Sequence, residues 1–249
     1  MKFGLRFRSI FIKSGKILLR GIGNFQARHS LVDTSPFLQS GQFAWVTELE
    51  SQWESIKIEL DKILEKPEEI PAFHQLSPDQ KRISQGDNWK TFPFYVFGIR
   101  LEENASLCPQ TIKAIEKLPG LQNAWFSILS PGYHIPPHKG PTRAVIRCHL
   151  GLVVPKDEDY CWLRVSDQIR SWQPGKCILF DDTYEHEVHN QTHESRVVLF
   201  LDVDRPSDWI GRLFNRLIIL LVRSSSYVRD PIKNLRDWNQ RLKSKKVSN

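Results

Sequence analysis

The chain has 249 residues, 40% of them hydrophobic, which is enough to bury a sizeable core in one domain with extensions. Its four cysteines show no CxxC spacing, which argues against a disulfide scaffold or a structural zinc site, so we expect reduced thiols in a cytoplasmic protein. The net charge of +7 is uneven: residues 1–32 carry seven Lys or Arg and no acid, residues 205–249 carry eleven against three acids, and the middle carries 17 against 25.

The first 32 residues have the composition of a basic amphipathic helix. Phe3, Phe7 and Leu18 belong to an apolar stripe that Lys and Arg flank throughout. This pattern is typical of a helix that lies on an anionic membrane surface, with a disordered basic tail as the alternative. Charges recur every few residues, which argues against an export signal, and the Phe, Ile and Leu content disfavours nucleic-acid binding.

The following segment predicts helices that support a sheet. Apolar residues at steps of three and four predict an amphipathic helix over Trp45–Glu65, which ends before Pro67 because proline cannot continue a helix. A short helix is expected at 78–84 and another at 109–117. Between them, Trp89–Arg100 reads as a strand whose proline favours an edge or a bulge.

Strands dominate the next part of the chain. Short apolar segments alternate with turn signals built from Gly, Pro, Ser and Asp. The predicted strands are Trp125–Leu129, Arg143–Val154, Trp162–Val165, Cys177–Phe180, Glu185–Asn190 and Ser195–Val203. No helix-length period interrupts this series, so we expect a largely antiparallel sheet folded as a sandwich or barrel.

A second basic segment follows the strands. Trp209–Val222 has only six consecutive apolar residues, well short of the roughly 20 that a membrane-spanning helix needs. With arginines spaced around it, we interpret it as an interfacial helix, with a core helix that caps the barrel as the alternative. The last residues predict a solvated basic end.

Two histidines in the strand-rich part of the chain are candidate metal ligands. His138 lies in PPHKGPTR and His186 in DDTYEHEVHN, with 47 residues between them. Imidazole is the most common metal ligand in proteins, so two such residues on one sheet favour a metal clamp.

Arginines inside apolar strands indicate an anion site. Strand alternation places Arg147 and His149 on one face, and Arg196 lies in SRVVLFLDVD, where one of the two apolar faces should be a barrel interior. A buried guanidinium needs a partner, and with Ser127 nearby these arginines would suit a dicarboxylate. The alternative is that the arginines pair with acids of the chain itself, namely Asp181, Asp182 or Asp202.

Three blocks of sequence together resemble a known family. They are SILSPGYHIPPHKGPTRAVIRCHLGLVVP, WQPGKCILFDDTYEHEVHN and RVVLFLDVDRP, in this order, over roughly residues 123–206. They resemble the aspartyl/asparaginyl β-hydroxylase family of Fe(II)- and 2-oxoglutarate-dependent dioxygenases. The resemblance implies a mainly β protein with flanking helices, built on a double-stranded β-helix, which is a jelly-roll or cupin-like barrel. It also implies an enzyme that hydroxylates an unactivated C–H with O₂, Fe(II) and 2-oxoglutarate.

The resemblance assigns His138 and His186 to the iron. Many dioxygenases add a carboxylate in a His-x-Asp pattern, and here Gly140 stands in that position, as it does in the hydroxylases that this chain most resembles. Glu185 and Glu187 alternate away from His186, which makes them poor substitutes. We expect no ligand role for the remaining histidines of this region, His134, His189 and His193.

The resemblance assigns four further residues to 2-oxoglutarate. Arg196 and Ser127 match residues that bind its far carboxylate. Arg147 and His149 match residues near its metal-chelating end.

The substrate is expected at a membrane. The family includes peptidyl Asp/Asn hydroxylases, and related bacterial enzymes hydroxylate lipid A acyl chains at the cytoplasmic membrane face. Two basic amphipathic ends favour a lipid acyl chain and an anionic membrane partner, and hence a peripheral location on the inner face of the membrane, whereas Gly140 favours a peptidyl Asp or Asn. A catalytically silent, membrane-associated jelly-roll module that binds metal or carboxylate is the alternative from a different class, which the complete set of His and Arg disfavours.

The expected organisation has three parts. Residues 1–32 form the basic N-terminal segment, and residues 205–249 form the basic C-terminal segment. The dioxygenase domain occupies 33–204, with helical support at 45–117 and the jelly-roll core at 123–204.

Overall fold

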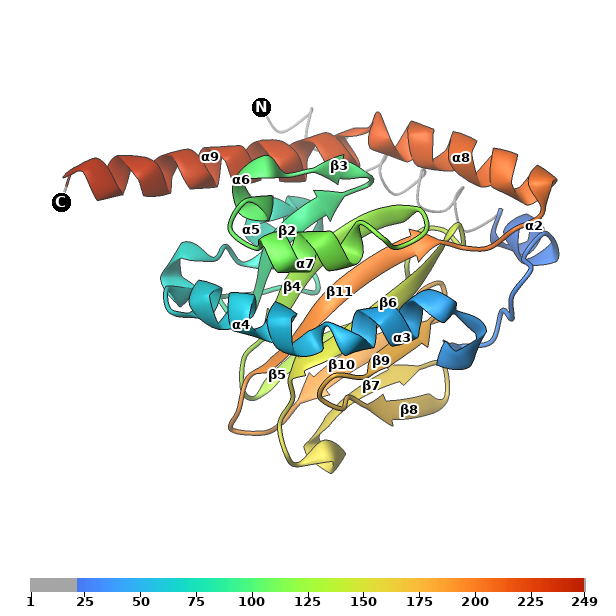
Figure 1. Ribbon diagram of the computed structural model, residues 1–249, viewed down its shortest axis with the longest axis horizontal. Coiled ribbons are helices and arrows are strands. Elements are labelled where there is room, and N and C mark those ends of the chain that lie inside the picture. The colour runs from blue at the N-terminus through green and yellow to red at the C-terminus, as the bar shows by residue number, and fades with distance from the viewer. Residues whose placement is uncertain (1–21, 249) are drawn as a thin grey trace.

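Two antiparallel sheets form the centre of the protein in a computed structural model that describes residues 22–248 (Figure 1). The larger sheet has the strand order β1-β9-β6-β11-β4-β2-β3, and the smaller sheet has the order β5-β10-β7-β8. The larger sheet consists of β1 (Phe37–Leu38), β2 (Trp89–Val96), β3 (Ile99–Arg100), β4 (Leu121–Leu129), β6 (Val145–Val153), β9 (Cys177–Phe180) and β11 (Arg196–Asp204). The smaller sheet consists of β5 (Tyr133–His138), β7 (Cys161–Val165), β8 (Gln168–Ser171) and β10 (His186–Asn190).

The central strand β11 is buried on both faces, and its alternation divides the core. Val197, Leu199 and Leu201 face the helical side of the larger sheet. Val198 faces the space between the sheets, where it packs with residues such as Leu163 of β7. This arrangement confirms the expected double-stranded β-helix, because both layers and the antiparallel order are present.

Three helices, α3 (Ala44–Ser51), α4 (Trp53–Leu64) and α7 (Pro109–Ile115), cover the outer face of the larger sheet (Figure 1). The other helices of the described chain are α2 (Gly23–Arg28), α5 (Phe73–Leu76), α6 (Glu102–Ala105), α8 (Trp209–Arg223) and α9 (Ser226–Ser248). Short 3-10 turns lie at Ser40–Gln42, Pro67–Glu69, Pro78–Gln80 and Glu158–Tyr160. Ile56 and Leu60 of α4 are fully buried against this face, together with Ile115 of α7. The amphipathic stripe predicted from the sequence is therefore core.

The structure corrects several predicted boundaries. The single helix expected over Trp45–Glu65 is two helices, because the chain breaks at Gln52. The strand expected over Trp89–Arg100 is a hairpin of β2 and β3, whose turn contains Phe97 and Gly98 at positive φ. The strands β5 and β8 were not predicted. Prolines interrupt β5, and β8 is largely exposed.

Two consecutive helices at the C-terminal end lie along one side of the molecule (Figure 1). The buried residues of α8 and α9 share a small core with Leu76 and Leu101, and this core includes Ile218, Val222 and Leu235. The expected solvated basic end is the second half of α9, where Trp238 donates a hydrogen bond to the carbonyl oxygen of Glu69 at 2.8 Å. Among residues 22–248, no helix is long and apolar enough to cross a membrane. The helix predicted near the N-terminus lies mostly in residues 1–21, outside the described part of the chain.

Candidate active site

His138 and His186 lie side by side on neighbouring strands of the smaller sheet. They are partners in the β5–β10 register, and their ring centroids are 4.1 Å apart. Nδ1 of His138 contacts the carbonyl oxygen of Pro136 at 2.9 Å, and Nδ1 of His186 contacts that of Tyr184 at 3.0 Å. A carbonyl can only accept, so each Nδ1 carries a proton, and Nε2 of each ring is the nitrogen that would bind a metal.

The surroundings keep His186 neutral. Burial lowers the pKa of His186 well below its usual range, and the neighbouring His138 and Arg147 lower it further. Neutral imidazole is the form that binds metals, so the electrostatics suit a ligand role.

A β-bulge decides which way His138 points. The register shifts between His186 and Val188, so that these two residues pair with His138 and Ile135. The extra residue on β5 reverses the alternation, because His134 and His138 are an even number of residues apart yet lie on opposite faces of the sheet. His134 is on the exposed face, whereas His138 lines the interior pocket.

Asp182 fills the space beside Gly140. The backbone N–H of Gly140 donates to the carbonyl oxygen of Asp182 at 2.6 Å, and a Cβ added at Gly140 would overlap the carboxylate of Asp182. Burial raises the pKa of Asp182 to about 7, against the opposing effect of Arg147. Its Oδ1 has no hydrogen-bond partner among the described residues. Asp182 therefore places a carboxylate next to the position where His-x-Asp enzymes carry their third ligand.

The two interior arginines differ in their partners. Arg147 makes ion pairs with Asp202 at 2.9 Å and with Asp182 at 2.9 Å, and it lies over the ring of Phe200 at 4.4 Å. The alternative that arginines pair with acids of the chain is therefore realised for Arg147. These contacts fix the orientation of its guanidinium at the pocket wall.

Arg196 is buried without such a partner. Only 1% of the residue is exposed, and its Nε and Nη1 have no hydrogen-bond partner within residues 22–248. Burial lowers the pKa of Arg196 to about 10, and its guanidinium lies 4.6 Å from the ring centroid of Trp172. An uncompensated buried cation is costly, so this site favours a bound anion.

Ser127 and His149 complete the buried polar group. Ser127 lies on β4 beside β11, and its hydroxyl accepts a hydrogen bond from Trp89 at 3.0 Å. That hydroxyl keeps its own proton to donate to an anion. His149 packs against Phe180 and Trp172, with both ring nitrogens buried and unpaired in the described structure. Burial lowers the pKa of His149 well below its usual range.

A pocket of about 660 Å³ opens beside these residues. His138, Arg147 and Asp182 contribute to its polar part, and Ile219 and Leu235 contribute to its apolar part. The other four predicted site residues lie in the buried interior of the barrel instead, namely Ser127, His149, His186 and Arg196. The six predicted residues thus lie along the space between the sheets, from Arg196 at the start of β11 to Arg147 opposite Asp202 near its end, with His138 and Arg147 on the pocket wall.

The residues present fit both an iron ion and a dicarboxylate. Two imidazoles lie side by side, and a carboxylate stands nearby. Arg196, whose Nε and Nη1 have no partner among residues 22–248, supplies the charge for an anion. The contribution of Asp182 was missed by sequence reasoning, which considered it only as a salt-bridge partner. The available signal in the sequence was the pair Asp181-Asp182, because its second member lies four residues before His186.

These features define a jelly-roll protein with a polar interior site that opens to one pocket. A sequence model of the family described as aspartyl/asparaginyl β-hydroxylase matches residues 50–206, and the chain belongs to this family. Relatives of the chain are named as hydroxylases, which supports an enzyme of the hydroxylase type.

Two relatives illustrate the range of the family. An "Ornithine lipid ester-linked acyl 2-hydroxylase" from Rhizobium tropici is 38% identical over 215 residues, which cover 86% of this chain and 76% of the relative. The human "Aspartyl/asparaginyl beta-hydroxylase" is 31% identical over 68% of this chain, but the match covers only 22% of that much longer protein. Among solved structures, a prolyl-4-hydroxylase from Pseudomonas putida is similar with a TM-score of 0.40 and 15% identity, over 76% of this chain and 100% of the other.

Proposed function

We propose that the protein is an Fe(II)- and 2-oxoglutarate-dependent dioxygenase that hydroxylates an acyl chain of a membrane lipid. The assignment of 2-oxoglutarate rests on Arg196, a buried cation without an acidic partner in the described structure. It lies in the same interior as the neighbouring His138 and His186. A dicarboxylate would supply the missing charge through bidentate, charge-assisted hydrogen bonds.

The iron would be held by Nε2 of His138 and Nε2 of His186. When bound, the metal supplies the oxygen chemistry: one C–H, one O₂ and one 2-oxoglutarate give one C–OH, one succinate and one CO₂. The Nδ1 hydrogen bonds orient both imidazoles, and burial keeps His186 neutral. Asp182 would accept a hydrogen bond from water at the position that Gly140 leaves without a ligand.

The cosubstrate would lie between the two arginines. Arg196 and Ser127 would bind the far carboxylate of 2-oxoglutarate. Arg147 and His149 would face the end that chelates the metal, where Asp182 and Asp202 hold the guanidinium of Arg147 in place. The buried walls would exclude water from this end of the barrel.

One helix connects the pocket with the outer surface, which supports a lipid substrate. Ile218, Ile219 and Val222 of α8 line the pocket. On its opposite side the same helix exposes an apolar stripe, with exposed fractions of 74% for Trp209 and 66% for Leu213. The stripe continues through Leu217, Leu220 and Leu221.

Arginines flank this stripe and favour an anionic membrane surface as the partner. Arg212, Arg216 and Arg223 are all exposed on α8. Apolar residues that enter the interface, next to cations that meet lipid headgroups, are the pattern of a peripheral membrane helix. With α8 docked, the apolar part of the pocket would lie close to the acyl chains, on the cytoplasmic side of the membrane. The proposed organisation is a basic N-terminal segment, a dioxygenase domain and a basic C-terminal segment.

The R. tropici relative is named for the ester-linked acyl chain of an ornithine lipid, which is the substrate class that we propose. The human relative is named for aspartyl and asparaginyl residues, so a peptidyl Asp or Asn is the second candidate.

The test is succinate formation from 2-oxoglutarate by the full chain with Fe(II) and O₂, in the presence of ornithine lipid vesicles or of Asp- and Asn-containing peptides. We expect lipid-stimulated turnover and a lipid product heavier by one oxygen in mass spectrometry. Turnover with peptides alone would overturn the lipid assignment. Absence of succinate under all conditions would favour the silent binding module.

A further inference from the structure

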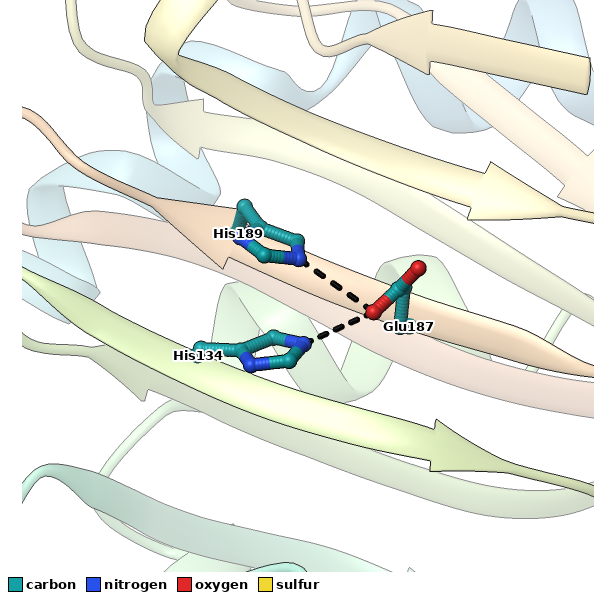
Figure 2. A group of neighbouring side chains, drawn as sticks. All are labelled: His134, Glu187 and His189. Carbon is teal, nitrogen blue, oxygen red and sulfur yellow. Dashed lines mark hydrogen bonds and ion pairs between the residues drawn. The ribbon is translucent and has the colours of Figure 1, made fainter.

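A second group of potential metal ligands lies on the opposite face of the strands that carry His138 and His186. Figure 2 shows His134 on β5 and Glu187 and His189 on β10, with all three side chains pointing toward one another. His134 and His189 are direct partners in the β5–β10 register. The group faces away from the barrel interior, because Ile135 and Val188, which alternate with its members, are buried in the core.

Both imidazoles contact the same carboxylate oxygen. Oε2 of Glu187 lies 2.8 Å from Nε2 of His134 and 3.2 Å from Nε2 of His189 (Figure 2). The other oxygen, Oε1, accepts a hydrogen bond from Nε of Arg164, the cross-strand partner of Glu187 on β7. Arg164 therefore orients the carboxylate so that Oε2 faces the two rings.

The two rings are held by stacking. The imidazoles of His134 and His189 stack with centroids 3.8 Å apart, and the indole of Trp162 covers the other side of His189 at 4.0 Å. Oε2 of Glu187 can only accept, so Nε2 of His189 is the nitrogen that carries the proton in this structure. Nδ1 of His189 has no hydrogen-bond partner in the part of the chain that the structure describes, so no contact there prevents the proton from moving to Nδ1 when a metal takes Nε2.

We propose that His134, Glu187 and His189 form a second, surface-exposed site for a divalent cation of the Zn²⁺ type. Two imidazoles and one carboxylate are a ligand set that zinc accepts, with water in the fourth position. Zinc bonds of about 2.0–2.2 Å place neighbouring ligand atoms of a tetrahedron roughly 3.3–3.5 Å apart. The two measured Nε2–Oε2 distances are slightly shorter than this, and all three donor atoms lie within 4.8 Å of one another, so small side-chain rotations would complete the site.

The exposed side of the site admits the ion and its water. The side chain of His134 is 41% exposed, whereas those of Glu187 and His189 are 12% and 17% exposed. The pocket that contains His138 does not include any of the three ligands, so this group lies apart from the proposed cosubstrate site.

Cation binding would join β5 to β10 from outside the barrel. The same two strands carry His138 and His186 on their inner face, next to the bulge. A ligand that binds only the folded state stabilises it according to its concentration and affinity, so the cation would stabilise this pair of strands. The inference does not depend on the proposed function, because it uses different side chains.

The test measures Zn²⁺ binding in a protein that lacks both interior histidines. The H138A/H186A variant is titrated with ZnCl₂ by calorimetry, and we expect one equivalent to bind. Adding H134A to this background should weaken Zn²⁺ binding by at least about tenfold. Loss of a residue that only hydrogen-bonds to a metal ligand already has an effect of this size, so loss of a ligand should have at least the same effect. Adding H193A, which removes an exposed histidine outside the group, should leave binding unchanged.

A second measurement guards against misfolding of the double variant. In the wild-type chain, H134A should remove one equivalent of bound Zn²⁺. It should also reduce the rise in melting temperature that Zn²⁺ causes. The H193A variant should change neither the stoichiometry nor the rise in melting temperature. Equal Zn²⁺ stoichiometry in the wild type, H134A and H193A would overturn the proposal, whether or not 2-oxoglutarate turnover is observed.

Discussion

The carboxylate of Asp182 occupies the space into which a side chain at Gly140 would project. The two residues are also joined through the backbone, by the hydrogen bond from the N–H of Gly140 to the carbonyl oxygen of Asp182 at 2.6 Å. The glycine that looked like a missing ligand in the sequence is therefore a steric requirement. An aspartate at position 140 and the observed position of Asp182 exclude each other.

Replacement of Gly140 by alanine should destabilise the protein, because the new Cβ forces the Asp182 carboxylate away from Arg147. Overpacking of this kind costs about 1–3 kcal/mol in unfolding free energy. Adding D182A creates the space that the new methyl group needs, so the double variant G140A/D182A should lose less stability than the sum of the two single variants. Denaturant unfolding of the four proteins measures this coupling, and strictly additive losses would contradict the steric explanation.

Replacement of Arg196 by methionine should weaken the binding of 2-oxoglutarate. The methionine removes a buried charge without a described partner, so we expect the folded protein to tolerate it well. Loss of hydrogen bonds to a charged ligand costs about 1.5–3 kcal/mol, which corresponds to roughly 10- to 150-fold weaker binding. Thermal unfolding with and without 2-oxoglutarate checks this. A ligand-induced shift in the melting temperature of R196M equal to that of the wild type would rule out the assignment.

Loss of His138 should eliminate Fe(II)-dependent turnover. The H138A variant removes one of two proposed ligands, so we expect succinate production to fall by more than roughly 100-fold. Loss of a residue that only hydrogen-bonds to a metal ligand costs up to about 100-fold, and loss of a ligand should cost more. Exposed His193 provides the matched control, since H193A should retain wild-type activity. Succinate production at the wild-type rate by H138A would remove the iron assignment.

Charges on the exposed stripe of α8 should weaken membrane binding. Leu217 and Leu220 are 53% and 58% exposed, so glutamates at these positions should fold normally and repel an anionic surface. Cosedimentation with vesicles that contain anionic lipid measures the effect, and the fraction bound should fall for L217E/L220E. Ile169 on β8 is 58% exposed and far from α8 in the sequence, so I169E is the control. Equal loss of binding in both variants would contradict docking through α8.

Asp208 should make the stability of α8 depend on pH. Its side chain accepts a hydrogen bond from the N–H of Gly211, which lowers the pKa of Asp208, and the contact with His29 lowers it further. The folded state therefore favours the ionised form. Its stabilising effect is complete above the ordinary pKa of 3.8 and is lost as the pH falls through the lower folded value.

The D208N variant isolates this effect, because asparagine still caps the helix but does not titrate. Unfolding free energies measured at several pH values should show an advantage of the wild type over D208N above about pH 4 that shrinks at lower pH. An advantage that grows on acidification would contradict the assigned direction.

Much of the fold follows from local pattern. The continuous apolar run of β11 predicted a strand with two apolar faces, because a strand inside a two-layer barrel must be apolar on each side. Strand alternation in β6 placed Arg147 and His149 on one face, and the structure has both on the inner face. Strand β5 could not be predicted in this way, since its prolines and histidines resemble a loop and only pairing with β10 makes it a strand.

What the sequence by itself determined is which residues could do chemistry: three histidines, two arginines and a serine, and a glycine where a ligand is common. Only the tertiary structure decided their partners. It paired Arg147 with aspartates and left Arg196 without an acidic partner among residues 22–248, because the two lie at different depths of the barrel. It also sent His134 outward and His138 inward through a bulge, since the position of an extra residue depends on the neighbouring strand and has no signature in the residues themselves.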